Sequence, residues 1–143
     1  MEKILMIHGI GHDKMGKEPG LHTVTMEELN DQLTQAAVKI SVEMSFYQSN
    51  EEDEVCGKIL SAKEEGFAGI LFNPATWMEN GEAIAKALSQ TPLPVVELHM
   101  TNTCKQANSH NVIAPSVTGL VTGFGEMVYT TGLQMLVEYL RQQ

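Results

Sequence analysis

The chain has 143 residues, 43% of them hydrophobic, which is typical of one compact domain, residues 1–143, with its own core. Acidic residues outnumber basic ones by 18 to 9, and the formal charge of −9 argues against nucleic acid as a partner. No apolar stretch approaches the roughly 20 residues that cross a membrane, no signal peptide is apparent, and the two cysteines lack a pairing or metal-binding spacing, so we expect a cytoplasmic protein.

The first half of the chain begins with a strand, a loop and a helix. The four central residues of the segment 3–8 are apolar, and the segment predicts a buried strand. Residues 9–24 are rich in glycine and predict a long loop, which in a compact domain is typical of an active-site lid. Thr25 and Glu28 have the spacing of a capping box, so a helix is expected from there to about Lys39.

The same alternation continues through the middle of the chain. Residues 42–48 alternate between apolar and polar side chains and predict a second strand, after which Asn50 is expected to cap a second helix. Residues 67–72 are apolar on both faces, as a central parallel strand is. A third helix over residues 80–89 and a fourth strand over residues 95–99 follow.

The last elements complete a fold class. Residues 119–122 predict a fifth strand and residues 126–141 a closing helix. Five strands with helices between them predict an α/β fold, a doubly wound five-stranded parallel sheet with helices on both faces. Such sheets bind ligands beyond the carboxyl ends of their strands, where the loops after His8, Asn73 and His99 should meet.

Two of these strand ends carry candidate chemistry. Glu97 and His99 lie two positions apart on one strand, so both side chains project to the same face. A carboxylate beside an imidazole orients the ring and favours its protonated form, which suits a general acid, although a purely structural histidine is the plainer alternative. Asn73 precedes Pro74 and could bind a carboxylate or simply end its strand.

Six short segments, in this order, resemble the type II dehydroquinases, enzymes that dehydrate 3-dehydroquinate. The segments are residues 3–9, 16–19, 46–50, 72–75, 95–102 and 119–125. The fold of that family is flavodoxin-like, its trimers gather into a dodecamer, and neither a metal nor an organic cofactor takes part. The resemblance therefore implies a homododecamer that acts on a small carboxylate substrate without a cofactor.

The resemblance also implies roles for individual residues. In the family, a lid tyrosine activated by an arginine removes a proton from C2, an asparagine-held water stabilises the enolate, and a histidine protonates the leaving hydroxyl. The matching motifs imply His99 as that acid, Glu97 as its partner and Asn73 as a substrate ligand. Thr101 and the backbone of Met100 would hold the substrate carboxylate.

The lid departs from the family pattern Gly-Pro-Asn-Leu-Asn-Leu-Leu-Gly, since residues 9–16 read Gly-Ile-Gly-His-Asp-Lys-Met-Gly. His22 stands where the tyrosine is expected and is the candidate base, Lys17 takes the place of the arginine, and Gly11 replaces the water-holding asparagine. A neutral imidazole is a better base at pH 7 than an unperturbed phenol, and Lys17 beside it would keep the ring neutral.

The remaining substrate contacts of the family are also altered. Glu79 replaces a substrate-binding histidine, and the shortened segment 108–111 has lost its arginine and leaves His110 as a candidate ligand. These losses allow two alternatives. The chain could be a diverged family member that acts on another small hydroxy acid, or a catalytically inactive ligand-binding paralogue.

A metal site is a further alternative, because imidazole and carboxylate groups crowd the predicted pocket and are ligands of Zn, Mn and Fe. The candidates are His12, Asp13, His22, Glu79, His99 and His110. No two of them have the i, i+4 spacing of a helix-borne pair, so histidines that face solvent or form hydrogen bonds are favoured and no metal is expected.

Overall fold

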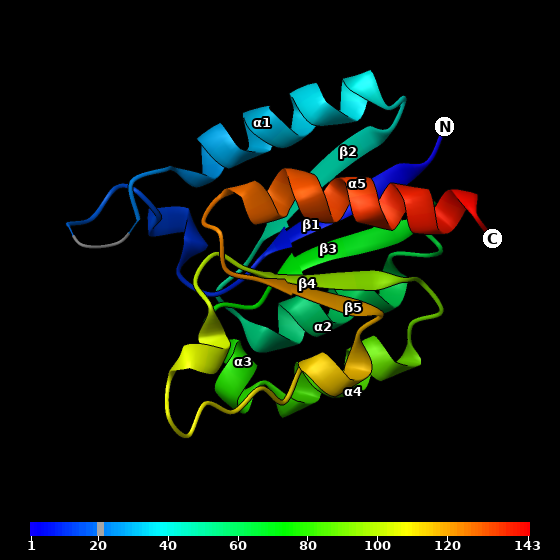
Figure 1. Cartoon of the computed structure of the whole chain (residues 1–143). Coiled ribbons are helices and arrows are strands. Elements are labelled where there is room, and N and C mark those ends of the chain that lie inside the picture. The colour runs from blue at the N-terminus through cyan, green and yellow to red at the C-terminus, as the bar shows by residue number, and fades with distance from the viewer. Residues whose placement is uncertain (20–21) are drawn as a thin grey trace.

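The computed structural model describes residues 1–19 and 22–143 and shows a five-stranded, wholly parallel sheet (Figure 1). The strands are β1 (Lys3–His8), β2 (Glu43–Gln48), β3 (Gly69–Asn73), β4 (Val95–His99) and β5 (Gly119–Thr122). Their spatial order is β2-β1-β3-β4-β5, the order of flavodoxin-like sheets. The predicted fold class is therefore confirmed.

Helices cover both faces of this sheet. On one face lie α1 (Met26–Lys39) and α5 (Met127–Arg141), and on the other α2 (Glu52–Ser61), α3 (Trp77–Asn80) and α4 (Glu82–Gln90) (Figure 1). The connecting loops contain short 3-10 turns, namely η1 (His12–Lys14), η2 (Thr103–Lys105) and η3 (Ala114–Ser116). Among the described residues, no helix is long and apolar enough to span a bilayer.

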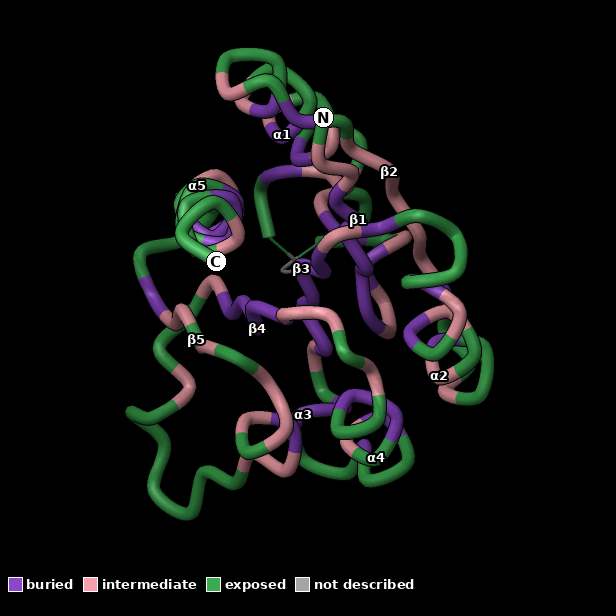
Figure 2. Tube along the Cα trace, turned by 90° about the vertical axis from the view of Figure 1, so that its right-hand side faces the viewer, coloured by how far each residue is buried: buried purple, intermediate pink, exposed green. Residues whose placement is uncertain are grey.

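The central strands are apolar because they supply side chains to two cores. In β1, Ile4 and Met6 pack with α1 and α5, while Leu5 and Ile7 pack with α2 and α4. This alternation follows from the two-residue period of a strand. Figure 2 shows the result, with buried residues concentrated in β1, β3 and β4.

Helix α1 begins as predicted, whereas the predicted cap of α2 is wrong. The Glu28 N–H donates to Thr25 Oγ1 (3.1 Å) and the Thr25 N–H to Glu28 Oε1 (3.0 Å), which completes the capping box. Asn50 caps nothing, because α2 begins after Glu51. Its Oδ1 instead accepts the N–H of Gly11 at 2.8 Å and ties the start of the lid loop to the end of β2.

The helix predicted over residues 80–89 is α4, which begins two residues later than predicted. The Gly81 N–H donates to Trp77 O and ends α3, a short helix that was not predicted, before α4 begins. A Cβ at Gly81 would lie 2.6 Å from that oxygen, so the tight turn requires glycine. The lid is also not structureless throughout, since it contains η1.

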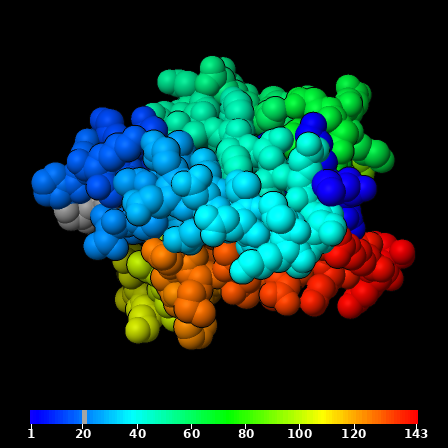
Figure 3. Space-filling model, turned by 90° about the horizontal axis from the view of Figure 1, so that it is seen from above, coloured from blue at the N-terminus to red at the C-terminus, as the bar shows by residue number. Residues whose placement is uncertain are grey.

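The two ends of the chain are fastened together. The Arg141 guanidinium donates to both carboxylate oxygens of Glu2 (2.7 and 2.9 Å) and to the carbonyl of Ile40 (2.7 Å). Figure 3 shows the N-terminal residues beside the end of α5. This contact holds α5 against the edge of the sheet opposite to the loops that build the site.

Candidate active site

A cavity of about 320 Å³ opens at the carboxyl ends of β1, β3 and β4, where doubly wound sheets bind ligands. It is large enough for a small-molecule substrate. Most of the predicted site residues line it, namely His22, Asn73, Glu79, His99, Met100 and Thr101. Other residues that line the cavity were not predicted as substrate ligands and include Ile10, His12, Met15, Thr76, Met78 and Thr103.

The loops after β1 and β3 approach each other closely because of one glycine. His8 and Asn73 are partners in the register of the two strands, and the N–H of Gly9 donates to Asn73 O at 2.8 Å. A Cβ on Gly9 would lie 2.5 Å from that same oxygen, so no larger residue fits. The approach brings the start of the lid next to the Asn73 strand end.

Glu97 and His99 form a buried pair, as their shared strand face predicts. His99 Nε2 lies 2.5 Å from Glu97 Oε2, and the amide of Asn111 donates to the same oxygen at 2.8 Å. Glu97 is fully buried and His99 is 5% exposed. Because Nε2 is used by Glu97, Nδ1 is the nitrogen of His99 that remains for a ligand in the cavity.

The Asn73 side chain is fixed from two sides. Its Oδ1 accepts the N–H of Ala75 (3.1 Å), and its Nδ2 donates to the hydroxyl of Tyr129 on α5 (2.8 Å). Burial raises the pKa of Tyr129 to about 12, so this phenol stays protonated at neutral pH. One amide hydrogen of Asn73 is left for a ligand.

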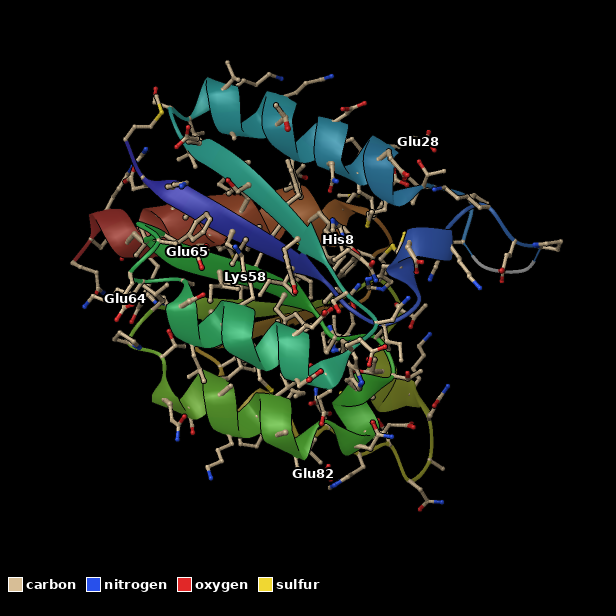
Figure 4. The ribbon with its side chains drawn as sticks, turned by 180° about the vertical axis from the view of Figure 1, so that it is seen from behind. His8, Glu28, Lys58, Glu64, Glu65 and Glu82 are labelled. Carbon is tan, nitrogen blue, oxygen red and sulfur yellow. The ribbon has the colours of Figure 1, made fainter. Side chains whose placement is uncertain are left out.

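Two histidines at the end of β1 are buried. His8 Nε2 donates to Asn30 Oδ1 on α1 at 2.7 Å (Figure 4). This hydrogen bond links the end of β1 to α1, and His8 does not line the cavity. His12 does line it, and its Nδ1 accepts the N–H of Gly9 at 3.0 Å. Burial lowers the pKa of His8 to about 4. Burial, and then the neighbouring His8, His22 and His99, lower the pKa of His12 to about 3.

Three predicted site residues do not line the cavity, namely Lys17, His110 and Glu97, of which Glu97 is buried behind His99 as its hydrogen-bond partner. Lys17 Nζ lies 2.8 Å from Glu27 Oε1 in an exposed ion pair at the start of α1, rather than serving the cavity beside His22. His110 is exposed in the loop after β4. Within residues 1–19 and 22–143, no three His, Cys, Asp or Glu side chains are grouped so that they could hold a metal ion.

Comparisons with known proteins agree with this geometry. The family described as Dehydroquinase class II matches residues 2–137. Proteins named 3-dehydroquinate dehydratase from Acaryochloris marina and Trichodesmium erythraeum are 36% and 35% identical to this chain, over 98% of it and 96% and 95% of their own lengths. The type II dehydroquinase from Butyrivibrio crossotus superposes with a TM-score of 0.90 at 26% identity, over 95% of this chain and 97% of that one. The chain belongs to the class II dehydroquinase family.

Proposed function

We propose that this protein is a hydro-lyase that converts 3-dehydroquinate to 3-dehydroshikimate in the cytoplasm, as one domain spanning residues 1–143. The main observation behind this proposal is the buried Glu97–His99 pair, in which His99 lines a cavity together with Asn73 and Thr101. The near-complete overlap with proteins named 3-dehydroquinate dehydratase supports the same substrate.

The proposed elimination uses two histidines, one in the loop before α1 and one at the end of β4. His22 removes the C2 proton, the electron pair of that bond forms a C2–C3 double bond, and the carbonyl at C3 becomes an enolate. When the enolate collapses, His99 gives its proton to the hydroxyl at C1, which leaves as water. Glu97 stabilises the positively charged imidazole that donates this proton.

The substrate carboxylate is proposed to bind at Thr101 and the Met100 backbone. The end of β5 and the loop after it fix this segment by donating to three successive carbonyls. These bonds are Gly123 N–H to His99 O (2.9 Å), Gly125 N–H to Met100 O (2.9 Å) and Thr122 Oγ1 to Thr101 O (3.0 Å). A segment held in this way binds the carboxylate without further loss of backbone entropy. Glu79 also lines the cavity and would accept hydrogen bonds from substrate hydroxyls.

The test is an assay of purified protein with 3-dehydroquinate, read as the ultraviolet absorbance of the conjugated product. We expect turnover by the unmutated protein and a fall in kcat of about a hundredfold or more in His22→Ala and in His99→Ala, because each removes a proton-transfer group. Thr23→Ala, an exposed change beside His22, is the matched control and should keep full activity.

The same assay separates the alternatives. Turnover of another hydroxy acid but not of 3-dehydroquinate would identify a diverged enzyme. Binding of small carboxylates without any turnover, unaffected by either histidine change, would identify a ligand-binding protein and overturn the proposal.

We also propose that the chain forms a homododecamer. Phe124 and Met127, at the junction of β5 and α5, are 87% and 65% exposed, which suits contact with another copy. Light scattering should then give a mass twelve times that of the 15.7 kDa chain. A monomer at micromolar concentration would contradict this assembly.

A further inference from the structure

The buried His12 ring has a fixed arrangement of its proton. The Gly9 N–H, already held by Asn73 O at 2.8 Å, also points at His12 Nδ1 at 3.0 Å. A proton on Nδ1 would face this N–H, so Nδ1 keeps its lone pair. A neutral imidazole that accepts at Nδ1 must carry its hydrogen on Nε2.

His12 is also held in its neutral form. The side chain is only 6% exposed, and burial lowers its pKa to about 3. At neutral pH the ring therefore neither accepts a proton at Nδ1 nor delivers one as an imidazolium. What it offers a ligand is an N–H donor of fixed direction, and such a neutral imidazole can polarise a carbonyl oxygen.

His12 lies in the same cavity as the two histidines proposed to move protons. His12 lines the cavity together with His22 and His99, and both are close enough to disfavour charge on its ring. Within the described residues, its Nε2 forms no hydrogen bond. In the proposed substrate, C2 lies between C1, which carries the leaving hydroxyl, and the C3 carbonyl. His22 acts at C2 and His99 at the C1 hydroxyl, so a third group beside them would contact the C3 oxygen.

This oxygen needs a hydrogen-bond donor because negative charge develops on it when the C2 proton leaves. Gly11, which lines the cavity beside His12, has no side chain to supply one. We propose that His12 is a catalytic residue whose Nε2–H donates directly to the C3 oxygen and stabilises the enolate, an inference that rests on the proposed function. As His22 takes the C2 proton and negative charge develops on that oxygen, the hydrogen bond strengthens. His12 itself gains and loses no proton in the cycle.

Two replacements of His12 separate this role from packing. His12→Leu fills similar space without a donor, and kcat should fall about a hundredfold while KM changes little, since the lost hydrogen bond is strong only in the transition state. His12→Gln places an amide N–H near the position of Nε2 and should recover part of the loss. With substrate deuterated at C2, His12→Leu should show a larger isotope effect on kcat, because proton removal has become slower.

The unmutated protein tests the premise directly. Nitrogen-15 NMR of labelled histidine should show His12 as the neutral Nε2–H tautomer between about pH 5 and 8. An Nδ1–H tautomer, or titration in that range, would overturn the inference whether or not the variants fold. Full kcat in a folded His12→Leu protein would overturn it while leaving the proposed function intact. Absence of turnover in the unmutated protein would overturn the proposed function and this inference with it.

Discussion

The Glu97 carboxylate has no contact with solvent and receives hydrogen bonds from His99 and Asn111. Glu97→Gln keeps the shape of the side chain and removes its charge, so the His99 imidazolium loses its stabilising partner. We expect kcat for 3-dehydroquinate to fall by about tenfold to a hundredfold, and the free energy of unfolding to fall by about 1–3 kcal/mol. Steady-state kinetics and urea unfolding measure both.

The matched control for this change is Glu82→Gln. Glu82 is exposed at the start of α4 and does not line the cavity (Figure 4). The Glu82→Gln substitution should alter neither kcat nor the free energy of unfolding measurably. If Glu97→Gln behaved like this control, Glu97 would have no part in the proton transfer.

At the residue scale, what the sequence could predict depended on how local the contact is. Glu97 and His99 share a strand face two residues apart, so their pairing follows from the geometry of a strand. The hydrogen bond from Asn73 to Tyr129 joins residues 56 positions apart, and nothing in the apolar pattern of α5 indicates it. His12 could be predicted as a pocket residue, but its tautomer depends on the distant contact between Gly9 and Asn73.

At the element scale, the capping box at the start of α1 predicts how much a single substitution lowers stability. Thr25→Ala removes the hydroxyl that accepts the Glu28 N–H, so α1 loses half of its capping box. The free energy of unfolding should fall by about 1 kcal/mol. Thr34→Ala in the middle of the same helix is the control. The exposed Thr34 hydroxyl donates to the carbonyl of Asn30 within the helix, and its loss should cost at most a few tenths of a kcal/mol. Equal losses in urea unfolding would show that the cap does not stabilise the protein.

Whether an element was predicted correctly depended on the position of its signal. The α1 cap and the strand over residues 95–99 have their signals within the segment itself, and both bounds agree with the structure. The short α3 and its end at Gly81 were not predicted, because the close contact of Gly81 with Trp77 O appears only in three dimensions. The role of Asn50 was mispredicted for the same reason, since its amide oxygen accepts a hydrogen bond from Gly11, which is distant in the sequence.

At the scale of the whole molecule, alternating strands and helices were enough to predict a parallel sheet covered on both faces. The spatial order of the strands was not contained in that pattern, because each crossover could pass to either side. It came with the resemblance of six segments to a flavodoxin-like family, and the order β2-β1-β3-β4-β5 agrees with it. The homododecamer rests on the same resemblance, and it stays a prediction.

The buried histidines make the stability of the whole molecule depend on pH. His8 and His12 have folded-state pKa values of about 4 and about 3, below the ordinary 6.5. Below pH 6.5 the unfolded chain therefore binds protons that the folded chain refuses, so stability is full above pH 6.5 and falls as the pH drops towards 4. The slope approaches about 1.4 kcal/mol per pH unit for each histidine. The carboxylate of Glu2, whose pKa is lowered to about 2 by Arg141, adds its own loss only below 4.5.

Urea unfolding between pH 6.5 and 4.5 isolates the histidine contribution, because this window lies above the ordinary pKa of the carboxylates. His8→Asn removes one titrating ring while keeping a side chain that can bond to Asn30, so the fall in stability with pH should become shallower by roughly one proton. His12→Leu should do the same, and the double change should leave the curve nearly flat. An unchanged slope in all three variants would mean that neither ring is held neutral by the fold, and the fixed donor proposed for His12 would lose its physical basis.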